Sequence, residues 1–175
     1  VRTDTGEVLL DCGMIQGGPE RHDRNRRDFA FDAPGLTAVL LTHAHIDHSG
    51  RLPLLLRRGF KGPILATEPT AELCRIMLAD SGRIQEEDAR WKIKRLKKKG
   101  KDASWVKPLY TEEEALEAVS LIRGVEFHRE IPLDGAGTAV YHMAGHILGA
   151  GIVELRVRNG GEPRRILFSG DLGQD

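Results

Sequence analysis

The sequence predicts an α/β fold, and three observations lead to this prediction. Short β-rich runs recur along the 175 residues, helical patterns separate the earlier runs, and the later runs follow one another like hairpin strands. Hydrophobic residues make up 40% of the chain, and 26 basic residues balance 26 acidic ones, as in an ordinary soluble domain. This mixture indicates an α/β sandwich rather than a helical bundle or a barrel.

Strands are predicted where a β-rich run is bounded by turn residues, at 7–11, 38–42, 63–67, 124–128, 138–142, 151–158 and 164–169. A helix is predicted through SGRLPLLLRRG at 49–59, and a second begins near Pro69 and runs through ELCRIMLAD at 72–80. A third opens at a capping box, Thr111 to Glu114, and continues to about Ile122.

A polar and very basic segment at about 84–110 is predicted to be a helical excursion from the sheet core. It holds seven Lys or Arg between Lys92 and Lys101, and Gly100 precedes an irregular stretch. Because the net charge of the chain is zero, attraction to nucleic acid would have to come from such a local cluster. A solvated helix end and an RNA contact explain the run equally well, since Trp91 and Trp105 flank it without forming a stacking pattern. The candidate RNA contacts are Lys92, Lys94, Arg95, Lys97, Lys98 and Lys99, with the four arginines of 21–27 as a weaker second surface.

Cys12 and Cys74 lie far apart in apolar segments, which favours buried thiols over a disulfide framework and makes a cytoplasmic location the expectation. The apolar runs are much shorter than the roughly 20 residues of a membrane span, so no membrane association is expected. The chain begins VRTDTGEVLL, without a methionine or a signal-peptide pattern, and we expect its start to be missing.

The stretch LTHAHIDHSG at 41–50 is the clearest candidate site. His43 and His45 are two residues apart, so in an extended segment both side chains lie on one face and can reach one ion. They follow the apolar run AVLLT, and ligand sites in α/β sheets favour the C-terminal ends of strands. Asp47 and His48 come next, at a spacing that suits a second ion. Imidazole and carboxylate ligands suit zinc, with iron or manganese as alternatives, and the plain alternative is a solvated histidine-rich loop.

Two later residues repeat this placement at the end of a strand. His146 lies in the glycine-rich segment AGHILGAG, and Asp171 lies in SGDLG after the RRILF run. Each alone is typical of a turn, and together with the first cluster they are candidate ligands. Asp11, at the end of EVLLD, is either a turn residue or an acceptor that orients a ligand histidine, and we favour the second use. The remaining histidines are predicted to be solvated or structural: His22, His128 and His142.

These residues, in order, resemble the motifs of the metallo-β-lactamase fold: Asp11 in LLDCG, THAHIDH at 42–48, His146 in AGHILGAG and Asp171 in SGDLG. The longer segments HAHIDHSGRLPLL, AGHILGAG and LLDCGMIQGG resemble the β-CASP branch of RNA-processing nucleases, which includes the polyadenylation-site endonuclease. The resemblance covers essentially the whole chain.

The resemblance implies a zinc-dependent hydrolase with an αββα sandwich and two zinc ions per site in the full-length protein, acting on RNA phosphodiester bonds through an activated water. It places His43, His45 and His146 on one zinc and Asp47 and His48 on the other. Asp171 would bridge the ions, Asp47 and Asp171 would be the catalytic carboxylates, and Asp11 would orient a ligand.

Compared with that family, residues 1–175 correspond to the N-terminal half of the sandwich. We expect the β-CASP domain, the closing segment with its further histidines and the usual first strand to be absent, and the isolated fragment to be inactive. RNA is the expected partner, and a homodimer is left open. Two other functions are left open as well: a small-molecule metallohydrolase acting on a thioester or lactam, and a non-catalytic scaffold subunit of an RNA-processing complex.

Overall fold

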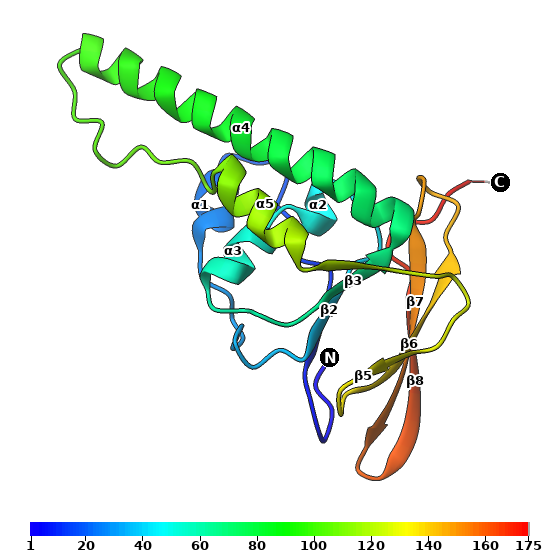
Figure 1. The fold of residues 1–175 in the computed structure, drawn as a ribbon. Helices are drawn as coiled ribbons and strands as arrows, with labels where there is room; N and C mark the ends of the chain where they lie inside the picture. The colour runs from blue at the N-terminus through cyan, green and yellow to red at the C-terminus, as the bar shows by residue number, and fades with distance from the viewer. Residues whose placement is uncertain (175) are drawn as a thin grey trace.

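In the computed structural model, which describes residues 1–174, two four-stranded sheets pack face to face and helices cover the outer side of the first sheet (Figure 1). The first sheet is parallel and contains, in order, β1 (Val8–Leu10), β2 (Ala38–Leu40), β3 (Ile64–Thr67) and β4 (Ile122–Val125). The second is an antiparallel meander of β5 (Ile131–Leu133), β6 (Gly137–Met143), β7 (Gly151–Asn159) and β8 (Glu162–Phe168).

The first sheet is parallel, with helices in the connections between its strands, and it is buried on one face by these helices and on the other by the second sheet. The central strands β2 and β3 read AVL and ILAT, and all seven residues are buried, as expected for a parallel sheet between two layers. The connections carry α1 (Arg21–Arg26), α2 (Ile46–Ser49), α3 (Leu52–Arg57), α4 (Glu68–Lys98) and α5 (Glu112–Ser120). Parallel strands end at the same edge of the sheet, so the loops that follow β1 and β2 meet there.

Local sequence signals explain where the two longer helices begin. Thr67 caps α4 by accepting a hydrogen bond from the backbone N–H of Thr70, and Pro69 sits in the first turn. The predicted capping box is present at α5, where Thr111 and Glu114 exchange side-chain and backbone hydrogen bonds. Gly82 of α4 lies where α5 begins, and a Cβ there would be 2.7 Å from a backbone nitrogen of α5, so the glycine permits the close packing of the two helices.

Two apolar cores hold the layers together. The first lies between the helices and the first sheet and includes Leu41, Leu55 and Tyr110, and the second lies between the sheets around Leu40 and Tyr141. The Tyr141 hydroxyl donates a hydrogen bond of 2.7 Å to the backbone carbonyl of Leu65, joining β6 to β3. The loops at the end of the second sheet are thereby held against the edge of the first. The described residues form a helix–sheet–sheet stack, and the outer helical layer of an αββα sandwich is not among them.

The predicted elements are found, with corrections at their boundaries. The helix predicted at 72–80 and the basic run are one continuous helix, α4, of 31 residues, and its far end extends beyond the body of the domain (Figure 1). The strand predicted at 124–128 covers Ile122–Val125, and α5 ends at Ser120, because Ile122 is buried in the first core and pairs with Ile64. Helix α1 and strand β5 were not predicted.

The segment 101–110 is irregular, as predicted, but it is not a free loop. It returns along α4 with Ala103, Val106, Leu109 and Tyr110 buried. The assignment of 84–110 as an excursion from the domain remains a prediction. Both cysteines are free and buried, as the sequence indicates. Among residues 1–174, no helix is long and apolar enough to cross a membrane.

Candidate metal centre

The first histidine pair lies at the C-terminal edge of the parallel sheet, as its position after an apolar run predicts. Beyond β2 the chain stays extended, because the N–H of Leu41 bonds to the carbonyl of Leu65 and the carbonyl of Thr42 accepts from Gly151 over 2.9 Å. His43 is fully buried, and His45 is the residue before α2. The Nε2 atom of His43 is 3.0 Å from Nδ1 of His45, so the two rings converge on one point.

His146 joins this pair from the second sheet. It lies in the β6–β7 loop, and its Nε2 atom is 3.2 Å from Nδ1 of His45. The loop is anchored by the carbonyl of Gly149, which accepts hydrogen bonds from the hydroxyls of Thr67 (2.6 Å) and Thr70 (3.0 Å). Gly149 has a φ of +81°, and a Cβ there would lie 2.6 Å from the backbone nitrogen of Thr70. Only glycine fits this contact, so the residue fixes the approach of the His146 loop to the first sheet.

The Asp171 carboxylate lies between two sets of histidines. One oxygen, Oδ2, is 3.8 Å from Nε2 of His43 and 3.6 Å from Nε2 of His146. The other, Oδ1, is 3.3 Å from Nε2 of His48. The side chain is 45% exposed, so this side of the cluster opens to solvent.

Asp11 supports the cluster from behind. Its backbone has a φ of +55°, a conformation that non-glycine residues adopt rarely and that Asp and Asn tolerate best. Its Oδ1 accepts from the backbone N–H of Thr42 (2.7 Å), while Oδ2 lies 2.8 Å from the Thr42 hydroxyl and 2.7 Å from Nδ1 of His48. This is the contact pattern of a residue that orients ligand histidines, the use of Asp11 that the sequence favours.

The hydrogen bonds of Asp11 determine which ring nitrogens carry protons. An ionised carboxylate only accepts, so the Thr42 hydroxyl and Nδ1 of His48 both donate to it. The Thr42 oxygen is then free to accept from Nδ1 of His43, 3.0 Å away. In both histidines Nδ1 holds a proton, and Nε2 faces Asp171.

The electrostatics of the cluster agree with this assignment at His43. Burial, together with the neighbouring His48 and His45, lowers the pKa of His43 to about 4, so its imidazole is neutral at pH 7. The hydrogen bond to Asp11 raises the pKa of His48 above its ordinary value. The Nε2 lone pair of neutral His43 would face the Asp171 Oδ2 atom at 3.8 Å, and such atoms repel unless a cation lies between them.

The donor set fits a transition-metal ion. Ligand atoms of His43, His45, His146 and Asp171 all lie within 4.8 Å of one another. In a tetrahedral zinc site with Zn–N bonds of ~2.0–2.1 Å, neighbouring ligand atoms are ~3.3 Å apart. The two nitrogen–nitrogen distances to His45, 3.0 and 3.2 Å, are close to that value. The structure therefore contains a His/Asp metal-binding cluster with the chemistry that zinc prefers.

The other candidate residues are placed differently. His48 adjoins the group through Asp171, whereas Asp47 is exposed on α2 and is not one of the four clustered residues. Among the histidines predicted to be solvated or structural, His22 is exposed on α1 and His128 is exposed in a turn. The third, His142, lies 3.0 Å from a carboxylate oxygen of Glu154.

Sequence reasoning missed Thr42 and the two threonines that hold the His146 loop. The available signal for Thr42 was its position, directly after a buried strand and directly before His43. The chain has many other hydroxyl groups, however, and the sequence around Thr42 does not indicate that this residue links Asp11 to His43. Thr67 and Thr70 have the spacing of a helix cap, and the structure shows a second use of both hydroxyls.

The six candidate RNA contacts lie on two faces of α4. Lys92 and Arg95 line a groove that faces α1, together with Trp91 and Trp105. Another hollow of α4 is lined by Arg90, Ile93, Lys94, Lys97 and Lys98, and Lys99 is the cap residue at the end of the helix. The contacts themselves remain a prediction, but the basic run is not one uniform surface.

Comparison with known proteins relates this geometry to a family. Residues 1–174 match the metallo-beta-lactamase superfamily. The chain is 39% identical over 166 residues to Ribonuclease TTHA0252 of Thermus thermophilus, covering 95% of this chain and 32% of the relative. It is 32% identical over 182 residues to the transcription termination factor FttA of Thermococcus kodakarensis, covering 98% of this chain and 25% of that protein. The chain thus spans a third or less of the length of these relatives.

Superposition on solved structures supports the fold and nothing more specific. A B3 metallo-beta-lactamase with an active-site glutamic acid superposes with a TM-score of 0.57 at 20% identity, covering 97% of this chain and 54% of that one. The resemblance to the β-CASP branch is confirmed by the sequence relatives, which include a ribonuclease. With its α/β fold, its matching motifs and its His/Asp cluster, the chain belongs to the metallo-β-lactamase superfamily.

Proposed function

We propose that this chain carries most of the active site of a zinc-dependent ribonuclease that hydrolyses RNA phosphodiester bonds. The observation that carries the proposal is the position of Asp171 between His43 and His146 on one side and His48 on the other. A carboxylate flanked by two sets of imidazoles suits a site for two cations, and the relatives named above include a ribonuclease.

In this proposal His43, His45 and His146 would hold one zinc ion, Asp47 and His48 would contribute to a second, and Asp171 would contact both. When bound, a pair of zinc ions supplies a water of lowered pKa and neutralises charge on the phosphate oxygens. Asp47 and Asp171 are the carboxylates that would act in the reaction, and further ligands for the second ion would come from outside these residues.

The residues around the ligands have three tasks. Asp11 and Thr42 keep the protons on Nδ1 of His48 and His43, which leaves the Nε2 lone pairs available. Thr67 and Thr70 hold the loop that positions His146. The exposure of Asp171 leaves an opening through which a polymeric phosphodiester can approach, whereas His43 at the back of the site is fully buried.

The proposal is tested with His45→Ala and Asp171→Ala in the full-length protein. We expect both variants to lose RNA hydrolysis and to bind less zinc, while their circular dichroism spectra stay close to that of the wild type. The matched control is His128→Asn, which removes an exposed histidine from the turn between β4 and β5 and keeps a residue that tolerates its φ of +61°. It should retain zinc content and activity. Unchanged hydrolysis in both ligand variants would refute the site.

The choice of substrate is tested by offering the wild type a labelled RNA, a thioester and a β-lactam side by side. RNA cleavage that a chelator abolishes and added zinc restores is the expected result. Hydrolysis of the thioester or the lactam without RNA cleavage would instead support a small-molecule hydrolase on the same fold. A protein that binds RNA and zinc but cleaves none of the three substrates would support the scaffold function.

A further inference from the structure

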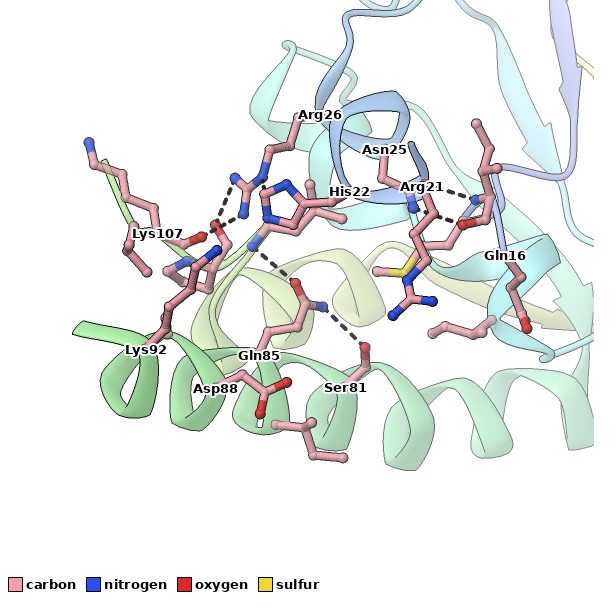
Figure 2. A pocket seen from close by; sticks show the side chains of 18 of the residues that line it. Gln16, Arg21, His22, Asn25, Arg26, Ser81, Gln85, Asp88, Lys92 and Lys107 are labelled. Carbon is pink, nitrogen blue, oxygen red and sulfur yellow. Dashed lines mark hydrogen bonds between the residues drawn. The ribbon is translucent and has the colours of Figure 1, made fainter. Parts of the chain in front are cut away.

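A groove of about 930 Å³ lies between α1, α4 and the segment 105–109, and we call it the α1–α4 groove (Figure 2). One end of its lining includes Ile46, the residue that follows the candidate ligand His45. Along α4 the lining extends from Met77 to Arg95. At 1.5 Å per helical residue that is about 27 Å, which matches roughly eight stacked nucleotides at 3.4 Å each.

Hydrogen bonds between side chains and the backbone connect the walls of the groove. Arg26 of α1 donates to the backbone carbonyl of Lys107 over 2.5 Å. On the opposite wall, Gln85 of α4 accepts from the backbone N–H of Leu109 over 3.0 Å. These contacts hold both α1 and α4 to the segment 105–109, so the groove exists without a ligand and binding need not first order it.

Both tryptophans of the chain line this groove, and both are unusually open to solvent. Trp91 is 62% exposed and Trp105 is 57% exposed. The Lys92 ammonium lies 4.4 Å from the centre of the Trp105 ring, and the Arg95 guanidinium lies 4.8 Å from that of Trp91. Each indole thus has a cation over one face and solvent on much of its remaining surface. The two tryptophans are 14 positions apart in the sequence, and the fold places both on one groove, where bases can stack on them.

The groove is positively charged in a chain whose net charge is zero. Its lining carries five cations and two carboxylates, and one of the carboxylates, Asp80, is paired with Arg83 outside the groove. Figure 2 shows Arg21 extending from α1 toward α4 and Lys92 extending from α4 toward α1. A ligand in the groove would meet cations from both walls, which is the charge pattern that a phosphate backbone complements.

We propose that the α1–α4 groove binds a single-stranded segment of RNA next to the stretch held at the metal centre. Bases stack on Trp91 and Trp105, and Lys92, Arg95 and Arg21 contact phosphates. This inference rests on the ribonuclease function proposed above. The groove adds affinity for long RNA and has no part in the reaction, since it meets the site only at Ile46.

The test compares RNA of about 20 nucleotides with RNA of about 4 nucleotides, the shorter one being too short to occupy both places. Binding is measured by fluorescence anisotropy of the full-length protein in a chelator, so that no RNA is cleaved. We expect Trp91→Ala/Trp105→Ala to weaken binding of the long RNA by roughly thirtyfold or more, because two stacking contacts are lost. Trp91→Phe/Trp105→Phe should retain most of the affinity, because a phenyl ring still stacks.

A charge variant tests the phosphate contacts on the same helix. For Lys92→Ala/Arg95→Ala, the slope of log affinity against log salt should become shallower by about 1.4, the value for two phosphate contacts to single-stranded RNA. The comparison variant is Lys94→Ala/Lys98→Ala, which removes the same charge from the other hollow of α4. An equal loss in both variants would show that total charge matters and would overturn the groove assignment.

A third variant removes two arginines far from the groove. Arg158 and Arg164 lie near the end of the β7–β8 hairpin and are exposed, so Arg158→Ala/Arg164→Ala should bind RNA like the wild type. If the tryptophan variants fold poorly, crosslinking of thiouridine-labelled RNA to the wild-type protein tests the same proposal. Crosslinks at Trp91 or Trp105 support the proposal, and crosslinks confined to other regions contradict it.

Cleavage assays separate this inference from the function on which it rests. The groove variants should cleave the short RNA at the wild-type rate and the long RNA with a raised KM and an unchanged kcat. A wild type that cleaves RNA while its groove variants match it at both lengths would overturn the groove alone. A wild type that neither binds nor cleaves RNA would overturn both proposals, and the groove would then be open to a protein partner.

Discussion

Asp11 and His48 are 37 positions apart in the chain, and one oxygen of the Asp11 carboxylate accepts a hydrogen bond of 2.7 Å from Nδ1 of His48. The same oxygen accepts from the Thr42 hydroxyl, so a single carboxylate orients His48 directly and His43 through Thr42. The candidate ligands on both sides of Asp171 therefore share one support. A disturbance at Asp11 should affect both sides of the metal centre together.

Asp11→Asn tests this shared support. Asparagine tolerates the φ of +55° at this position, so the substitution removes the charge and one acceptor without straining the backbone. We expect zinc affinity or RNA hydrolysis to fall roughly 10- to 100-fold, as is typical when the partner of a metal ligand is lost. Zinc content and turnover of the purified variant provide the measurement. Wild-type values for both would show that Asp11 serves only the turn after β1.

Thr42→Val tests the link between Asp11 and His43. The substitution keeps the shape but removes the hydroxyl, which leaves Nδ1–H of fully buried His43 without its acceptor. An unsatisfied buried donor costs about 1–3 kcal/mol, so the free energy of unfolding measured in a chelator should fall by about that amount. Zinc affinity should fall as well, because the ring loses its fixed orientation. Thr42→Ser retains the hydroxyl and should stay close to the wild type in both measurements.

Much of this site was predictable because its signals are local. The i, i+2 spacing of His43 and His45 and the apolar run before them predict two side chains on one face at the end of a strand. The placement of His146 and Asp171 after strands repeats that signal, and the structure brings all four residues together. The roles of Thr42 and Gly149 were not predictable, because they depend on contacts with residues 31 positions or more away.

The length of α4 shows a second limit of what could be predicted from the sequence. Its apolar residues stop forming a regular pattern after Asp80, so the sequence predicts one helix up to that point and a separate, basic helical excursion beyond it. The helix continues to Lys98 because most of the later residues are good helix formers and because the segment 101–110 packs along it. That packing also forms the α1–α4 groove, where Lys92 of α4 lies over the ring of Trp105.

Burial raises the pKa of the Cys74 thiol to about 12, which predicts a dependence of stability on alkaline pH. Because the pKa of the folded state lies above the unfolded value of 9.0, the contribution to stability is complete below pH 9 and is lost as the pH rises toward 12. The slope approaches roughly 1.4 kcal/mol per pH unit once the unfolded thiol ionises. Urea unfolding of wild type and Cys74→Ala between about pH 8 and 10.5 checks this, since the difference between the two proteins should shrink above pH 9.

The reactivity of the two cysteine thiols gives an independent test of their burial. Cys12 is 6% exposed and Cys74 is fully buried, so neither should react with Ellman's reagent in the folded protein near neutral pH. Both should react at once after unfolding in guanidinium. Rapid reaction of the folded protein would contradict the buried placement.

Gly149→Ala against Gly145→Ala tests how the His146 loop is held. Both glycines have a positive φ, +81° and +72°, so alanine should cost a similar strain of about 1–2 kcal/mol at each position. The difference lies in the surroundings. A Cβ at Gly149 would be 2.6 Å from the Thr70 nitrogen and 2.8 Å from the Thr67 hydroxyl, whereas a Cβ at Gly145 would meet no atom within 4 Å among residues 1–174 other than those of its chain neighbours.

We therefore expect Gly149→Ala to lower the free energy of unfolding by about 2 kcal/mol more than Gly145→Ala, measured in a chelator so that zinc does not contribute. The backbone of residue 149 would have to withdraw from the two threonine hydroxyls, which would move His146 away from His45. Zinc affinity should then fall in Gly149→Ala beyond any change in Gly145→Ala. Equal stability and equal zinc affinity in the two variants would show that the loop adapts and that the threonine contacts do not position His146.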